Sequence, residues 1–244
     1  LKPPHWPDMP SLASFRTEIE MESFNRIKRQ VHNNYRLFAW ELRKMGINVN
    51  CAPVLDLRYD FADDIMGDRC FSGDTYEVSQ IGKEICKGLL MGNCFPVIKH
   101  IPGHGRAVCD SHKELPIIKT SLDEMAATDF VPFKELADMP FAMTAHIKYT
   151  AIDPDECATN SEKVIYLIRK GIGFKGLLFS DDLTMKALKG SMKERASKAL
   201  KAGCDAVLHC SGDFDEMTEI AESLDFWSDE DRERFRDCWK YLRN

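Results

Sequence analysis

Several features that define large classes of proteins are missing from this sequence. No apolar run approaches the roughly 18–20 residues that a helix needs to cross a bilayer, so we expect no membrane-spanning segment. The formal net charge is -6, and a chain without a basic surplus is poorly suited to phosphate backbones, so we expect no nucleic-acid partner. No glycine-rich phosphate loop follows the first predicted strand, which argues against a dinucleotide-binding sheet.

The nine cysteines also lack the arrangement of a disulfide framework, because their number is odd and no CxxC pair occurs. Free thiols in a reducing cytoplasm are the simpler account, so we expect a cytoplasmic protein. The first residue is Leu1 rather than Met, and the proline-rich opening has neither the charged nor the apolar region of a secretory signal. We therefore expect either a processed chain or a fragment.

What the sequence does contain is a regular alternation of strand and helix patterns over its 244 residues. Apolar residues recurring every three or four positions predict helices at residues 24–45, 75–91, 161–170 and 192–202, and the capping pair Ser121 and Glu124 predicts another. Strand-like runs occupy residues 48–57, 94–100, 141–147, 176–182 and 205–210, and acidic amphipathic segments follow at 215–224 and 229–242. This rhythm of about 30 residues per unit predicts one α/β domain over residues 1–244, with a parallel sheet.

Polar residues lie at or just beyond the carboxyl ends of these strands. They are Asp56, Lys99, His100, His146, Asp181 and His209. In a (β/α)8 barrel the carboxyl ends of the strands converge on one active-site face. The sequence therefore predicts a TIM-type (β/α)8 barrel rather than a doubly wound sheet.

The run LLFSDDL, residues 177–183, places two adjacent carboxylates at the end of an apolar strand. Charges in such a position are costly unless they are paired or carry out chemistry. Because neighbouring strand residues point to opposite sides, Asp181 and Asp182 cannot share a role. Asp181 is the better candidate for a nucleophile, whereas Asp182 is equally well explained as the N-cap of a helix predicted at residues 183–190.

The loop HGRAVCDSHKELP, residues 104–116, contains Asp110 and His112, which lie on the same side of the chain if the segment is extended. A carboxylate beside an imidazole fixes its tautomer, raises its basicity and makes it a proton shuttle near neutral pH. Cys109 is better explained as an ordinary loop thiol than as a catalytic group.

The segment KHIPGHG, residues 99–105, places His100 and His104 four residues apart, which on a helix would suit a metal site. Pro102 and Gly103 lie between them and break any helix, so the metal interpretation loses its geometric support. Lys99 and His100 are better explained as donors to hydroxyl groups in a polar pocket.

The whole stretch KHIPGHGRAVCDSHKELP resembles the signature of glycoside hydrolase family 3, in particular of its β-N-acetylglucosaminidases, and FSDDLTM resembles the nucleophile segment of the same enzymes. NVNCAPVLDL, GDRCFSGD, AMTAHIKYTAID and AGCDAVLHC are similar to further segments of the family. The resemblance extends from about Pro10 to about Ser223 and so covers most of the chain.

This resemblance implies a retaining β-N-acetylhexosaminidase in which Asp181 is the nucleophile and forms a glycosyl-enzyme intermediate. His112, paired with Asp110, would be the acid and later the base, in place of the second carboxylate of most glycosidases. The sugar-binding residues it implies are Arg69, Lys99 and His100, with Asp56 as a weaker candidate that supports the pocket. It implies no metal and no organic cofactor, and a carbohydrate substrate: N-acetylglucosamine on peptidoglycan fragments with 1,6-anhydro-N-acetylmuramic acid, in cell-wall recycling.

Relatives in this family begin with two further strand–helix units, the second of which ends in an Asp-x-Glu-Gly-Gly segment that contributes a sugar-binding acid. This sequence contains no such segment, and a closed barrel needs about 250 residues. We therefore expect a barrel without its first one or two strand–helix units, either open or completed by a partner, with edge strands that favour association or instability.

Three alternative functions remain. A histidine does not repel an attacking phosphate as a carboxylate does, so the same residues suit an N-acetylglucosaminide phosphorylase. Loss of the first strands suits a truncated, non-catalytic sugar-binding homologue. A metal-dependent hydrolase has the least support, because the two histidines of KHIPGHG do not share a helix.

Overall fold

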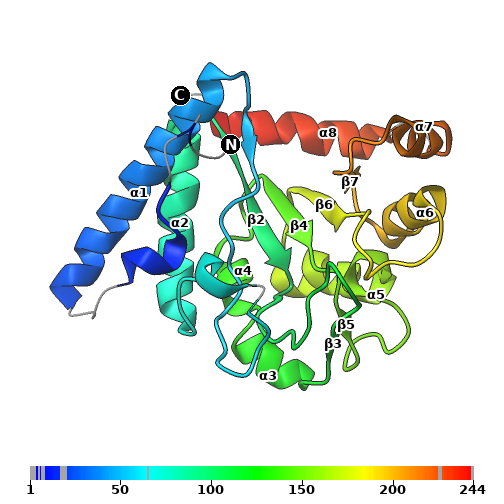
Figure 1. The fold of residues 1–244 in the computed structure, drawn as a ribbon, viewed down its shortest axis with the longest axis horizontal. Coiled ribbons are helices and arrows are strands. Elements are labelled where there is room, and N and C mark those ends of the chain that lie inside the picture. Colours follow the sequence, from blue (N-terminus) through cyan, green and yellow to red (C-terminus); the bar gives the residue numbers. More distant parts are fainter. Residues whose placement is uncertain are drawn as a thin grey trace.

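The computed structural model describes residues 4, 6, 9–16, 21–64, 66–224 and 227–242. Its main sheet contains five parallel strands: β1 (Val49–Asn50), β2 (Phe95–Ile101), β4 (Phe141–Thr144), β6 (Leu177–Asp182) and β7 (Ala206–Leu208). Within this sheet the strands pair in the order in which they occur in the chain, β1–β2–β4–β6–β7 (Figure 1). The strand order therefore never reverses, as it does at the switch point of a doubly wound sheet. The predicted barrel-type α/β fold is confirmed, in the form of an open parallel sheet.

Helices connect these strands at nearly the predicted positions. They are α1 (Met21–Lys44), α2 (Thr75–Met91), α3 (Leu122–Ala127), α4 (Val131–Glu135), α5 (Glu162–Tyr166), α6 (Met192–Ala202), α7 (Phe214–Glu222) and α8 (Asp229–Cys238). The predicted cap of α3 is present, because the Ser121 side chain accepts from the backbone N–H of Glu124. A second small parallel sheet, β3 (Ile117–Ile118) with β5 (Lys148–Tyr149), was not predicted from the sequence.

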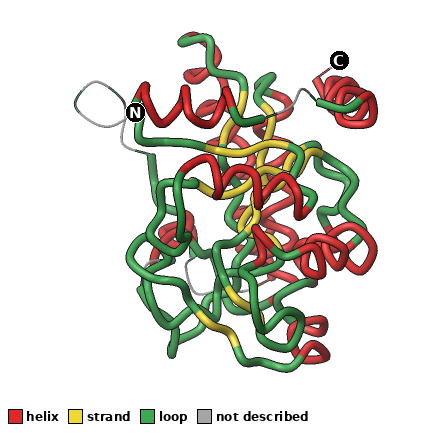
Figure 2. The backbone as a smooth tube through the Cα atoms, turned by 90° about the vertical axis from the view of Figure 1, so that its right-hand side faces the viewer, coloured by secondary structure: helices red, strands yellow, loops and turns green. Residues whose placement is uncertain are grey.

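The two faces of the main sheet pack against different partners. Ile98, Ala142 and Leu178 align across β2, β4 and β6 and belong to the large core cluster that includes residues of α1, α2, α5 and α6. Residues of the opposite parity, such as Val97 and Phe141, form a separate buried cluster on the other face. We call this second face, which corresponds to the interior of a barrel, the inner face. In the perpendicular view of Figure 2 the strands lie inside a layer of helices and loops.

The last helix, α8, covers the amino-terminal half of the inner face. Cys238 and Leu242 join the apolar cluster of this face, and the Trp239 ring meets Phe95 edge-on at 5.4 Å between centroids. Figure 1 shows α8 running across the amino-terminal ends of the strands. Phe95 and Phe141 are therefore each only 3% exposed although the sheet is open.

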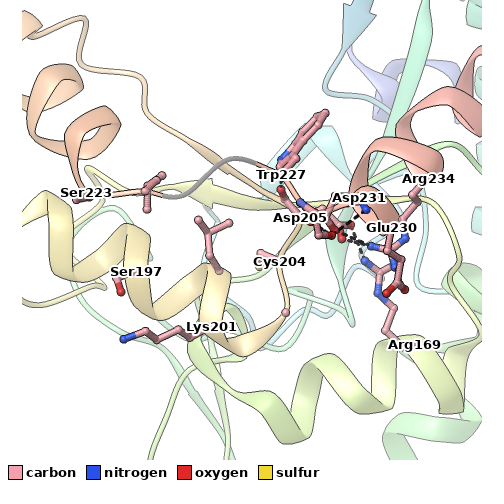
Figure 3. A pocket seen from close by; sticks show the side chains of 14 residues that line it. Arg169, Ser197, Lys201, Cys204, Asp205, Ser223, Trp227, Glu230, Asp231 and Arg234 are labelled. Atoms are coloured by element: carbon pink, nitrogen blue, oxygen red, sulfur yellow. Dashed lines mark hydrogen bonds and ion pairs between the residues drawn. The ribbon is translucent and has the colours of Figure 1, made fainter.

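A cluster of ion pairs around the buried Asp205 side chain holds the middle of α8. The Asp205 carboxylate, just before β7, accepts from Arg169 Nη2 at 2.6 Å, from Leu178 N at 2.7 Å and from Arg234 of α8. Arg169, Asp205 and Arg234 line a cavity of about 500 Å³ together with residues of α6 (Figure 3). The cavity lies at the amino-terminal end of the strands, opposite the predicted active-site face.

Two sequence predictions need correction. The helix expected at residues 183–190 is wrong, because this segment forms turns and the next helix begins at Met192. Asp182 instead closes a tight turn by accepting from Thr184 N and Thr184 Oγ1 at 3.0 and 2.6 Å. The first strand is shorter than residues 48–57, since only Val49–Asn50 is regular and Pro53 has no N–H to donate.

Among the helices of the described residues, none is both long and apolar enough to cross a membrane.

Candidate active site

Asp181 and Lys99 lie on the inner face, close to the carboxyl ends of their strands. Lys99 aligns with Met143, and Met143 with Phe179, so these three side chains share one row. Asp181 is two residues beyond Phe179 on β6 and points to the same side. The apolar part of the inner face thus gives way to charged groups where the strands end.

Several basic side chains surround the Asp181 carboxylate. Burial acts to raise the pKa of Asp181, but the charges of His100, His146 and Lys99 and the N–H of Asp182 outweigh it, so the pKa lies below its usual value. The Asp182 N–H donates to Asp181 Oδ1 at 2.8 Å. Asp181 is therefore ionised at neutral pH, as a carboxylate nucleophile must be.

Asp56 is the buried anchor of this end of the sheet. It is 1% exposed and accepts from the backbone N–H groups of His100 and His104, the latter at 2.6 Å. It also lies 2.7 Å from His100 Nδ1. Burial acts to raise the pKa of Asp56, but the effects of His100 and His104 in the opposite direction are together larger, so the pKa lies below its usual value. Since a carboxylate only accepts, Nδ1 of His100 carries the proton and Nε2 faces away.

A small cavity adjoins Lys99. It has a volume of about 220 Å³ and is lined by Arg69, Lys99, Cys51, Tyr35 and residues of the segment 10–12, among others. Burial holds the pKa of Lys99 below its usual value, with an opposing effect from Cys51 and Asp181. The structure thus places Arg69 beside Lys99 in this cavity and Asp56 beside His100. Lys99 and His100 both lie close enough to Asp181 to lower its pKa.

The pair Asp110 and His112 lies in the loop between β2 and β3. His112 Nδ1 is 2.9 Å from Asp110 Oδ1, and the His112 N–H donates to the same oxygen at 2.8 Å. The pair is therefore closed by a turn, and the extended geometry assumed from the sequence is wrong. Because Asp110 only accepts, His112 carries its proton on Nδ1 and presents Nε2 for proton transfer.

His112 lies at the surface, with 59% of its side chain exposed. Its carbonyl accepts from Lys186 N at 3.4 Å, which connects the loop to the segment that follows Asp181. Among the residues that the structure describes, no hydrogen bond or ion pair joins the side chains of His112 and Asp181.

Two further strand-end histidines differ in their surroundings. His146 is fully buried, with Nδ1 2.7 Å from Thr159 Oγ1 and Nε2 3.0 Å from the Asp182 carbonyl. His146 therefore belongs to the cluster around Asp181. Its position at the end of a predicted strand was the feature of the sequence that indicated this. His209 turns instead toward α7, where Nε2 lies 2.7 Å from Glu216.

The metal alternative rested on His100 and His104. The centroids of their rings lie 5.4 Å apart, and Nδ1 of His100 is hydrogen-bonded to the Asp56 carboxylate. Within the part of the chain that the structure describes, no group of three or more His, Cys, Asp or Glu side chains is placed to hold a metal ion.

The site contains an ionised carboxylate at the end of β6, basic side chains beside it and an Asp–His pair on the loop that follows β2. Such a set of groups suits nucleophilic displacement with assisted proton transfer. Known proteins are similar to this chain in fold and in sequence. NagZ from Neisseria gonorrhoeae, solved in complex with N-trifluoroacetyl-D-glucosamine, matches with a TM-score of 0.85 and 33% identity over 97% of this chain and 68% of that one. A glycoside hydrolase family 3 β-N-acetylglucosaminidase from Paenibacillus sp. str. FPU-7 matches with a TM-score of 0.79 and 27% identity, over 88% of this chain and 43% of that one.

Curated relatives agree with these structures. The beta-hexosaminidase of Methylobacillus flagellatus is 37% identical over 72% of this chain and 51% of its own length. That of Thiobacillus denitrificans is 35% identical over 84% of this chain and 57% of its own. The chain therefore spans about half the length of these relatives.

The family model described as the glycosyl hydrolase family 3 N terminal domain matches residues 6–235. This match covers nearly all of the chain, and it includes Asp181 together with the loop that contains Asp110 and His112. The chain therefore belongs to glycosyl hydrolase family 3.

Proposed function

We propose that this chain is the catalytic domain, over residues 1–244, of a retaining β-N-acetylhexosaminidase that hydrolyses terminal β-linked N-acetylglucosamine. Its substrates would be peptidoglycan fragments with 1,6-anhydro-N-acetylmuramic acid, in cytoplasmic cell-wall recycling. The observation that carries this proposal is the Asp181 carboxylate, whose pKa is kept low by His100, His146 and Lys99 despite its burial.

In the first step, Asp181 attacks the anomeric carbon and forms a glycosyl-enzyme bond while the bond to the leaving oxygen breaks. His112, protonated on both ring nitrogens and stabilised in this form by Asp110, gives its Nε2 proton to that oxygen and is left neutral with its remaining proton on Nδ1. In the second step, His112 takes a proton from water, the water oxygen attacks the anomeric carbon, and Asp181 is released.

Lys99, His100 and Arg69 are placed to hold the sugar. Lys99 and Arg69 line the same cavity, and His100 has its Nε2 turned away from Asp56. The N–H groups of Lys99 and Arg69 would donate to sugar oxygen atoms, and the unprotonated Nε2 of His100 would accept from a sugar hydroxyl group. Because His112 is exposed, we propose that its loop closes over the bound sugar before proton transfer.

The test is release of p-nitrophenol from its β-N-acetylglucosaminide. Asp181→Asn should lower kcat by on the order of 10³-fold, because the amide cannot form the covalent intermediate. His112→Ala should lower it by about 10²-fold or more. The exposed residue Asp215 on α7 provides the matched control, and Asp215→Asn should leave kcat unchanged.

Turnover of the Asp181 variant within about tenfold of the original would refute the nucleophile assignment. Formation of a sugar 1-phosphate in phosphate buffer would show that the enzyme is a phosphorylase and not a hydrolase. Binding of N-acetylglucosamine in calorimetry without any turnover would identify a non-catalytic sugar-binding protein instead.

A further inference from the structure

A hydrogen bond between two buried side chains connects the KHIPGHG turn to the loop of the Asp–His pair. His104 Nε2 lies 3.1 Å from Ser111 Oγ, and each of these residues is 3% exposed. His104 is seven residues before Ser111, so the bond closes the loop on itself. Ser111 stands between Asp110 and His112 in the sequence.

Of the three residues Asp110, Ser111 and His112, only Ser111 points inward. The Asp110 side chain is 14% exposed and the His112 side chain 59% exposed. Asp110 closes the turn, since its carboxylate accepts from the His112 N–H at 2.8 Å and its backbone carbonyl from the Lys113 N–H at 2.9 Å. The Ser111 hydroxyl thus attaches this turn to the interior through a side chain, in addition to the backbone bond from Lys186 N to the His112 carbonyl.

His104 is a rigid attachment point. Its backbone N–H donates to Asp56 at 2.6 Å, and the preceding carbonyl of Gly103 accepts from Tyr149 Oη at 2.8 Å. Burial and the neighbouring His100 lower the pKa of His104 to about 4, so the ring is neutral at physiological pH. Its Nδ1 is buried without a hydrogen-bond partner among the described residues, which leaves Ser111 as the partner of the ring.

We propose that His104 and Ser111 form a latch that positions the Asp110–His112 turn for proton transfer, a role that rests on the function proposed above. Neither residue touches the sugar, so both are positioning residues. The latch ties the buried part of the loop to the segment that Asp56 holds, and it guides the exposed part with His112 when the loop closes over the sugar. Loosening it leaves the nucleophile and the sugar pocket intact but misplaces the acid.

This selective effect can be measured with two aryl β-N-acetylglucosaminides. A 2,4-dinitrophenyl group leaves without protonation, whereas a phenyl group needs the acid. Ser111→Ala should lower kcat/KM for the phenyl substrate by about tenfold, since small misplacements of catalytic groups cost up to about 10²-fold. It should lower kcat/KM for the dinitrophenyl substrate by less than about twofold.

Three further variants sharpen the result. Ser111→Thr keeps the hydroxyl and should restore most of the phenyl activity. Val108→Ala, in the same loop and 63% exposed, is the matched control and should change neither substrate. The double variant His104→Gln with Ser111→Ala should cost no more than the larger single effect, because the two residues act through one bond. If Ser111→Ala lowered kcat/KM equally for both substrates, or for neither, the proposed role of the latch would be wrong.

Hydrogen exchange provides a readout that does not need turnover. The amides of His112, Lys113 and Glu114 are bonded to Asp110, and Ser111→Ala should speed their exchange while Val108→Ala does not. Unchanged exchange would contradict the latch even in an active enzyme. If the original protein hydrolyses neither substrate, the proposed function fails, and faster exchange in Ser111→Ala would still establish the attachment of the turn.

Discussion

The carboxylate of Asp56 determines much of the geometry on which the proposed chemistry depends. It holds two backbone amides and one imidazole of the segment 100–104 while almost completely buried. Such a charge is stable only because its hydrogen-bond donors replace water. The sequence marked Asp56 as a secondary member of the site, because a strand-end position reveals that a carboxylate is present but not how many donors it collects.

Replacing this carboxylate by an amide tests its structural role. Asp56→Asn puts an N–H₂ group among groups that all donate, so we expect the free energy of unfolding at pH 7 to fall by about 3 kcal/mol. Urea denaturation measures this loss. Asp60→Asn, at an exposed position four residues later, is the control and should change stability by less than about 0.5 kcal/mol.

The same variant gives a pH signature. The pKa of Asp56 is lower in the folded protein than its usual value of about 3.9, so its ionised form stabilises the fold above that value. This contribution is lost as the pH falls from about 4 through the folded pKa. The original protein should therefore lose more stability than Asp56→Asn on acidification below pH 4, and parallel pH profiles would show that Asp56 is not the group responsible.

At the scale of elements, the periodic segments were predictable and the irregular ones were not. Residues 75–91 and 192–202 form α2 and α6 as predicted, because apolar spacing and capping residues agree there. Residues 183–190 have helical spacing, yet Asp182 draws the backbone into a turn with Thr184. A local hydrogen bond from a short polar side chain competes with a helix start in a way that spacing does not reveal.

Gly105 illustrates another hidden constraint, and a substitution there tests it. The residue lies where the loop leaves β2, and a Cβ at this position would stand 2.0 Å from the Leu57 carbonyl oxygen. We expect Gly105→Ala to push the loop from the segment that contains Asp56 and to lower the free energy of unfolding by about 3 kcal/mol. Activity at low temperature should fall as well.

Gly171→Ala is the matched control for this prediction. Its Cβ would approach only the Leu167 side chain, at 3.3 Å, and helices tolerate alanine well. Thermal unfolding of both variants measures the difference. A Gly105 variant as stable as the Gly171 variant would mean that this close approach does not constrain the loop.

At the scale of the whole molecule, the open sheet is sealed by its own last helix. The sequence shows an acidic amphipathic segment at residues 229–242, but this pattern did not reveal which surface the segment covers. Cys238 is 2% exposed on the inner face, and its thiol lies 3.4 Å from the Pro140 carbonyl and 3.2 Å from the Arg234 carbonyl. The edge strands β1 and β7 are only two and three residues long, which limits edge-to-edge pairing.

A charge on this contact should therefore detach α8 from the sheet. Cys238→Asp would bury a carboxylate beside two carbonyl oxygens and an apolar cluster, with an expected loss of about 3–5 kcal/mol. Phe95, Phe141 and Leu177 would then face solvent, so the variant should bind a hydrophobic dye and elute as aggregates in size-exclusion chromatography. Arg236→Asp introduces the same group on the exposed side of α8 and should remain dye-free and compact. Equal behaviour of the two variants would show that α8 does not seal the inner face, and that the strands are protected by other contacts.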